Sequence, residues 1–111
     1  MARTTLTVQQ ISRTPLTPTY TAVDQPNGNQ FANDGRVILH VKNGGGSSTT
    51  LTIKRNYSVD GAAVPDLTVT VTNGQERKVG PFPTDLFNQS DGNVYLDWTV
   101  GTSVTISVER I

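Results

Sequence analysis

The chain has 111 residues, with nine basic and nine acidic side chains, so its formal net charge at pH 7 is zero. This length fits one domain that can bury roughly 65% of its unfolded surface, so a core is possible without covalent staples. The lack of cysteine excludes disulfides, thiolate catalysis and zinc fingers, and the single histidine, His40, excludes a multi-histidine metal cage. The zero net charge argues against a nucleic-acid binder that works by neutralising phosphates.

Threonine and valine dominate the composition, with 17 and 13 residues against five alanines and two glutamates. Because these β-branched side chains fit a pleated sheet and good helix formers are scarce, the expected fold is all-β. The first residues lack the apolar segment of a signal peptide, and no run reaches the 18 apolar residues of a membrane span. We therefore expect a soluble, unsecreted protein without a membrane partner.

Alternating apolar residues, interrupted by turn residues, predict strands along most of the chain. The expected strands lie at residues 3–10, 36–42, 50–57, 67–72, 76–79, 94–100 and 104–108, with a further short one at 20–23. The nearly continuous apolar run at 36–42 predicts a central strand covered on both faces. Residues 84–88 are expected to form a single helical turn.

Turn residues between neighbouring strands predict three hairpins. The expected pairs are 36–42 with 50–54, 67–72 with 76–79, and 94–100 with 104–108. Asp60-Gly61 also tolerates positive φ and is expected to close the segment that precedes it.

About eight strands at spacings of about ten residues predict one antiparallel β-sandwich over residues 1–111. A jelly roll fits better than an immunoglobulin sandwich, whose Cys-Trp-Cys pattern is absent. The apolar residues expected to face the core are Leu6, Val8, Val37, Leu39, Val41, Leu51, Ile53, Leu67, Val69, Val71, Val94, Leu96, Trp98, Val104, Ile106 and Val108.

Residues 12–35 form a long segment that three prolines and two Asx-Gly turns keep from regular patterning. Its apolar residues include Tyr20, Val23 and Phe31. Such a loop either docks these side chains onto a partner or folds back over the open end of the sandwich. The sequence leaves both interpretations open.

No group of residues in the sequence carries a catalytic or cofactor-binding signature. His40 lies mid-strand and is expected to be a surface-facing or hydrogen-bonded sheet histidine. The aspartates lie almost wholly in turns, without the alternating spacing of a calcium loop, and Gly44-Gly45-Gly46 lacks the Lys-Ser/Thr of a P-loop. We therefore expect no enzyme activity, no catalytic residue, no metal and no cofactor.

Three aromatic side chains, Trp98, Tyr95 and Tyr57, offer one alternative function, a platform on which sugar rings stack. This alternative is a jelly-roll carbohydrate-binding module or a tail or spike adhesion module. Trp98 shares a face with Val94 and Leu96, however, and this pattern favours a core position for its ring.

Several segments together resemble a family of small structural proteins of tailed bacteriophages, the head decoration or cement proteins. They are Pro18-Thr19-Tyr20-Thr21-Ala22, Asn27-Gly28-Asn29-Gln30-Phe31, Asn33-Asp34-Gly35-Arg36, Leu39-His40-Val41-Lys42-Asn43-Gly44, Val59-Asp60-Gly61 and Gly80-Pro81-Phe82-Pro83. The resemblance implies a β-rich, often jelly-roll-like, non-enzymatic protein, many relatives of which assemble as trimers on an expanded capsid.

This resemblance defines the expected partner and location, and with them the residues expected to make contacts. The partner would be the major capsid protein, bound across capsomer boundaries, and the protein would lie on the outer capsid surface of the virion after synthesis in the host cytoplasm. Residues expected to contribute to capsid or subunit contacts are Arg3, Leu6 and Val8 of the N-terminal arm together with Tyr20, Phe31 and Arg36.

Overall fold

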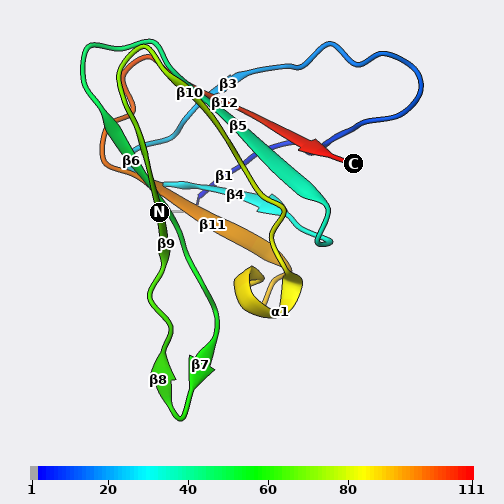
Figure 1. The fold of residues 1–111 in the computed structure, drawn as a ribbon, viewed down its shortest axis with the longest axis vertical. Coiled ribbons are helices and arrows are strands. Elements are labelled where there is room, and N and C mark those ends of the chain that lie inside the picture. The colour runs from blue at the N-terminus through cyan, green and yellow to red at the C-terminus, as the bar shows by residue number, and fades with distance from the viewer. Residues whose placement is uncertain (1–2) are drawn as a thin grey trace.

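The computed structural model describes residues 3–111, and nearly all of their regular structure is β (Figure 1). The strands are β1 (Thr4–Thr5), β2 (Gln9–Gln10), β3 (Thr21–Ala22), β4 (Asn29–Ala32), β5 (Val37–Asn43), β6 (Thr49–Ile53), β7 (Ser58–Val59), β8 (Ala62–Ala63), β9 (Leu67–Val71), β10 (Glu76–Val79), β11 (Asn93–Trp98) and β12 (Val104–Arg110). Helix α1 (Thr84–Phe87) is the single turn expected near residues 84–88. The expectation of about eight strands is wrong, because short strands bring the described number to twelve.

Two large sheets share these strands. The first has the order β1-β4-β11-β6-β9, and the second has the order β10-β5-β12-β2, with β3 also paired to β12. Strands β7 and β8 form a separate two-stranded sheet. The expectation of purely antiparallel sheets is wrong at two places, since β1 pairs parallel with β4 and β2 pairs parallel with β12.

All three expected hairpins are wrong, because each turn carries the chain from one large sheet to the other. Strand β5 pairs with β10 and β12, whereas β6 pairs with β9 and β11. The turns after β9 and after β11 likewise connect the first sheet to the second. Asp60-Gly61, expected only to close the segment before it, forms the turn of a hairpin between β7 and β8 that was not predicted from the sequence, and both turn residues have positive φ.

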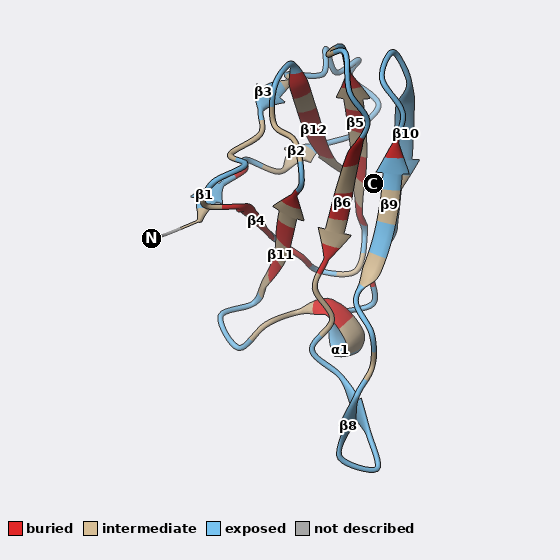
Figure 2. Cartoon of the chain, turned by 90° about the vertical axis from the view of Figure 1, so that its left-hand side faces the viewer, coloured by how far each residue is buried: buried red, intermediate tan, exposed pale blue. Residues whose placement is uncertain are grey.

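The core lies between the two large sheets, where alternate residues of the strands are buried (Figure 2). Of the sixteen core residues expected from the sequence, thirteen are buried, and Val8, Leu67 and Val69 are half-buried against them. Three aromatic residues that the pattern missed, Phe31, Phe82 and Phe87, complete the core. The outward side chains of β5 are half-buried, so the strand is shielded on both sides but fully covered only toward the core.

The N-terminal third is more regular than the sequence indicates. The single strand expected at residues 3–10 is divided into β1 and β2, which lie in different large sheets. The long segment 12–35 contains β3, at the place of the expected short strand, and also β4, which pairs with β1 and β11. Within residues 3–111, no helix is long and apolar enough to cross a membrane.

Candidate functional site

Residues 55–66 project from the body of the protein as a narrow hairpin, which we call the projecting arm. It contains β7 and β8 and lies at one end of the molecule's long axis, beyond α1 (Figures 1 and 2). Every residue from Asn56 to Ala63 is exposed. The arm therefore offers its side chains to a partner rather than to the core.

One face of the projecting arm is entirely apolar. Val59 lies opposite Ala62 in the strand register, and the Val64 N–H donates to the Tyr57 carbonyl, so Tyr57 lies opposite Val64. Because side chains two residues apart share a face, these four residues lie together. Tyr57 is 44% exposed and Val59 is 54% exposed. The other face carries Ser58 and Ala63, so the arm has one apolar face and one small, more polar face.

The base of the arm is tied to the helical turn and to itself. The Asn56 N–H donates to the Leu86 carbonyl and its side-chain amide donates to the Asn88 carbonyl. The Arg55 N–H donates to the Asp66 carboxylate, which closes the base. The Arg55 guanidinium lies 5.1 Å from the centroid of the Phe87 ring. These contacts fix the direction of the arm, although a two-stranded hairpin is only marginally stable by itself.

Arg3, an expected contact residue, instead joins the N-terminal segment to β11. Its Nη1 donates to Asp97 Oδ1 at 2.7 Å and to the Leu96 carbonyl at 2.9 Å. The guanidinium also lies over the Tyr95 ring, 4.6 Å from its centroid. Gly28, at φ 80°, leaves room for this pair, since a Cβ there would overlap the Arg3 guanidinium. With 19% of its side chain exposed, Arg3 has a structural role in this fold.

The Arg3–Asp97 pair predicts part of the acid sensitivity of the fold. Partial burial raises the pKa of Asp97, but the hydrogen bond and charge of Arg3 and the charge of Lys54 lower it more, to below its ordinary value. When the pKa of a carboxyl group is lower in the folded state than in the unfolded state, the ionised group stabilises the fold at pH values above its unfolded-state pKa. This stabilisation is lost as the pH falls through the folded-state pKa. We expect unfolding midpoints in urea to decrease below about pH 4 for the wild type and to decrease less steeply for Asp97→Asn. Equal slopes for the two proteins would contradict this assignment.

Tyr20, the second expected contact residue, lies over the outer face of the second large sheet. Its hydroxyl is 3.0 Å from His40 Nδ1, and Lys42 Nζ lies 4.0 Å from the centroid of its ring. His40 Nε2 lies 2.8 Å from Glu76 Oε1. His40 is thus the hydrogen-bonded sheet histidine that the sequence favoured. This part of segment 12–35 folds back onto the sheet, and Tyr20 is half-buried there.

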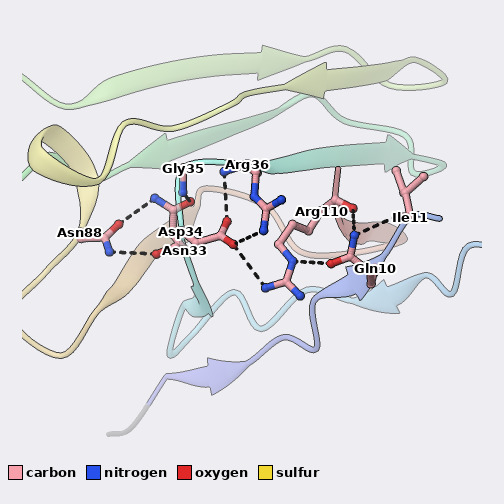
Figure 3. A network of polar contacts seen from close by, with 8 residues as sticks. All are labelled: Gln10, Ile11, Asn33, Asp34, Gly35, Arg36, Asn88 and Arg110. Atoms are coloured by element: carbon pink, nitrogen blue, oxygen red, sulfur yellow. Dashed lines mark hydrogen bonds and ion pairs between the residues drawn. The ribbon is translucent and has the colours of Figure 1, made fainter.

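Arg36 belongs to an exposed polar network at the ends of β5 and β12 (Figure 3). Asp34 Oδ2 lies 3.2 Å from Arg36 Nη2 and 3.4 Å from Arg110 Nη1, and Arg110 Nε donates to Gln10 Oε1. Desolvation raises the pKa of Asp34, but the hydrogen bonds and charge of Arg36 and the charge of Arg110 together lower it more, to below its ordinary value. The Arg36 side chain is 62% exposed, so it remains accessible to a partner.

The other three expected contact residues face the core. Phe31 is fully buried and Leu6 is 5% exposed, so the expectation that either contacts a partner is wrong for this fold. Val8 is half-buried against the same core. Their apolar side chains pack between the sheets because β4 and the segment after β1 lie within the sandwich-like body, where burial is favourable.

The aromatic platform expected as an alternative site does not assemble. Trp98 is 4% exposed, and its Nε1 donates to Asn29 Oδ1 at 2.9 Å. Tyr95 stacks against Arg3 and donates its hydroxyl to Asp91, on a strand away from the arm that carries Tyr57. Trp98 therefore has the core position that its pattern favoured.

Within residues 3–111, no three His, Asp or Glu side chains lie close enough together to hold a metal ion. Comparisons of the chain with protein families, with curated proteins and with solved structures found no match.

The residues of the projecting arm were not predicted as a site from the sequence. The sequence feature that could have indicated this hairpin is the Asp60-Gly61 turn, which is flanked by apolar residues at alternate positions.

Proposed function

We propose that this chain is a non-enzymatic structural protein of a tailed bacteriophage, which decorates the expanded capsid and stabilises it by binding across capsomer boundaries. In this proposal the partner is the major capsid protein, the protein assembles as a trimer where it is bound to the capsid, and its place is the outer surface of the virion. Stabilisation follows from mass action, because a ligand that binds only the expanded lattice favours that lattice.

The projecting arm is the observation that carries the proposal. An exposed apolar face on a hairpin that extends beyond the body can bury area against a neighbouring surface while the body rests on another subunit. The molecule measures 40 × 36 × 24 Å, and the arm lies at one end of its longest axis. This shape suits a contact that crosses a boundary.

A jelly-roll topology is the second part of the proposal, and the strand order supports it. With the separate β7-β8 hairpin and the two parallel-paired strands, β1 and β2, set aside, the remaining eight strands form two four-stranded layers, in which β3 has only two residues. Numbered by their order in the chain, these layers read 2-7-4-5 and 6-3-8-1, with consecutive strands mostly in opposite sheets. Two interleaved Greek keys give such an order.

Co-sedimentation with expanded and unexpanded capsids tests the proposed function. We expect saturable binding to expanded shells only, with affinity about tenfold or more lower for Val59→Asp, because a contact would bury the new carboxylate without a partner. Unchanged stability of the variant in urea would show that the loss arises at the contact, since Val59 is exposed in the free protein.

Ser58→Asp is the matched control, because Ser58 precedes Val59 on the same strand but points to the opposite face of the arm. It adds the same charge at nearly the same place and is expected to bind shells as the wild type does. If the wild type fails to bind expanded shells, the decoration proposal is wrong. If both aspartate variants bind normally, the capsid contact lies elsewhere than on the arm.

A further inference from the structure

Each of the two large sheets ends in edge strands, and most of these edge strands have a feature that discourages pairing with another chain. Strands β1, β2 and β3 have only two residues each. Strand β10 carries three consecutive charges, Glu76, Arg77 and Lys78. Short length and charge are the usual protections of an edge strand. Strand β9 is the remaining edge strand, and it has neither a short length nor a charged residue.

Strand β9 has the properties of an unprotected edge. Its five residues, Leu67–Val71, contain no charge, proline or glycine, and they pair along their full length with β6. The side chains of Thr68 and Thr70 are exposed, and Val69 between them is half-buried. An uncharged edge of this length with strict alternation is a template for pairing with another strand.

The hydrogen bonds of β6 show which backbone groups of β9 face outward. In β6, the Thr50 carbonyl accepts from the Thr99 N–H and the Lys54 N–H donates to the Tyr95 carbonyl, so even-numbered residues face β11. Odd-numbered residues of β6 therefore face β9, where Leu51 lies opposite Val69. It follows that Thr68 and Thr70 direct their N–H and carbonyl groups away from β6, toward the open margin.

We propose that β9 pairs antiparallel with β9 of a second copy of this chain, about a two-fold axis at Val69. In this register Thr68 of one copy lies opposite Thr70 of the other, and both of their outward backbone groups are satisfied. The exposed threonines form cross-strand pairs on one face, and Leu67 lies opposite Val71 on the other. Two copies of the strand can pair in this register because β9 carries no charge that would repel the second copy.

This contact is independent of the proposed capsid binding. The antiparallel two-fold directs the two projecting arms to opposite ends of the dimer and leaves their apolar faces free. The purified protein alone tests the contact, so a negative result leaves the decoration proposal standing, and a failed capsid assay leaves this contact standing.

Sedimentation equilibrium of the purified protein over a wide concentration range is the first test. We expect a concentration-dependent shift from 12.0 kDa toward twice that mass. Thr70→Pro removes an outward N–H but no bond to β6, so it should keep the fold and weaken the dimer by about tenfold or more, the effect of losing one hydrogen bond per strand. A mass of one chain at all concentrations overturns the proposal.

Lys78→Pro is the matched control for this variant. The Asn43 N–H donates to the Gln75 carbonyl, so odd-numbered residues of β5 face β10, and Lys78 directs its N–H to the open margin just as Thr70 does. It should dimerise as the wild type does. Equal weakening by the two proline variants, or none by Thr70→Pro, overturns the assignment to β9.

A second test needs no loss of binding. The chain has no cysteine, so Val69→Cys introduces a single thiol at the proposed two-fold axis. Facing residues of a non-hydrogen-bonded antiparallel pair have Cα atoms about 4.5 Å apart, within disulfide range. Mild oxidation should give a covalent dimer with Val69→Cys and not with Val79→Cys, the half-buried edge valine of β10. A covalent dimer formed equally by both variants, or by neither, contradicts the proposal.

Discussion

Replacing Phe31 with alanine is expected to lower the free energy of unfolding by about 3–5 kcal/mol. The Phe31 side chain is fully buried, and its ring centroid lies 5.9 Å from that of Phe82, which in turn lies 5.3 Å from that of Phe87. Truncation removes the aromatic contact between β4 and the segment that leads into α1, and it leaves a cavity there. Urea unfolding followed by circular dichroism measures the loss, with the slope of the transition unchanged.

Tyr57→Ala is the matched control, because it truncates an aromatic side chain that is 44% exposed on the projecting arm. Its effect on stability should lie within about 0.5 kcal/mol of the wild type. If Phe31→Ala were no more destabilising than Tyr57→Ala, β4 would lie outside the core, and docking of residues 12–35 onto a partner would again explain Phe31.

The sequence predicted the core well because strand side chains alternate between two faces. In β5 and β6 the apolar residues at alternate positions are the buried ones, as in Leu51 and Ile53. Phe31 was missed because the residues around it are mostly polar and its segment is rich in turns. Its burial depends on β4 lying between β1 and β11, which are distant in the sequence.

The sequence located turns but not the strands that pair across them. A turn such as Asn73-Gly74 reverses the chain equally well within one sheet or between two, and local chemistry does not distinguish the two cases. In this fold the Gly74 N–H donates to the Asn43 carbonyl, which ties the turn to the end of β5. Only the contacts with strands distant in the sequence decide whether the chain forms a hairpin within one sheet or passes to the other sheet.

The exposure of the projecting arm likewise could not be predicted from the local sequence. Tyr57 was singled out from the sequence for its ring, and Asp60-Gly61 for its turn, yet neither indicated an arm free of the core. The apolar face of residues 57–64 has the pattern of a buried hairpin. Its exposure follows from the position of β7 and β8 beyond α1, where no sheet covers them (Figure 2).

Replacing Asn29 with alanine is expected to lower the free energy of unfolding by about 3 kcal/mol or more. Asn29 is fully buried; its Oδ1 accepts from Trp98 Nε1 at 2.9 Å and from the Asp24 N–H at 3.0 Å, and its Nδ2 donates to the Thr4 carbonyl. Alanine leaves these three groups without their partner. The Trp98 N–H is buried, so loss of its acceptor costs about 1–3 kcal/mol, and the part-buried Asp24 N–H and Thr4 carbonyl each lose a hydrogen bond with a net value of about 0.5–1.5 kcal/mol. Because Trp98 is the single tryptophan, its fluorescence follows both unfolding and the change at its N–H.

Gln30→Ala is the control for this prediction, since Gln30 is the next residue of β4 and its amide donates to the Thr5 hydroxyl at the surface. Its loss should cost about 0.5 kcal/mol or less, because water replaces an exposed partner. Equal stability of the two variants would mean that Trp98 and Asp24 find other acceptors. A large difference would mean that one buried amide joins β1, β11 and the turn before β4, and so holds together the N-terminal segment that the sequence pattern left open.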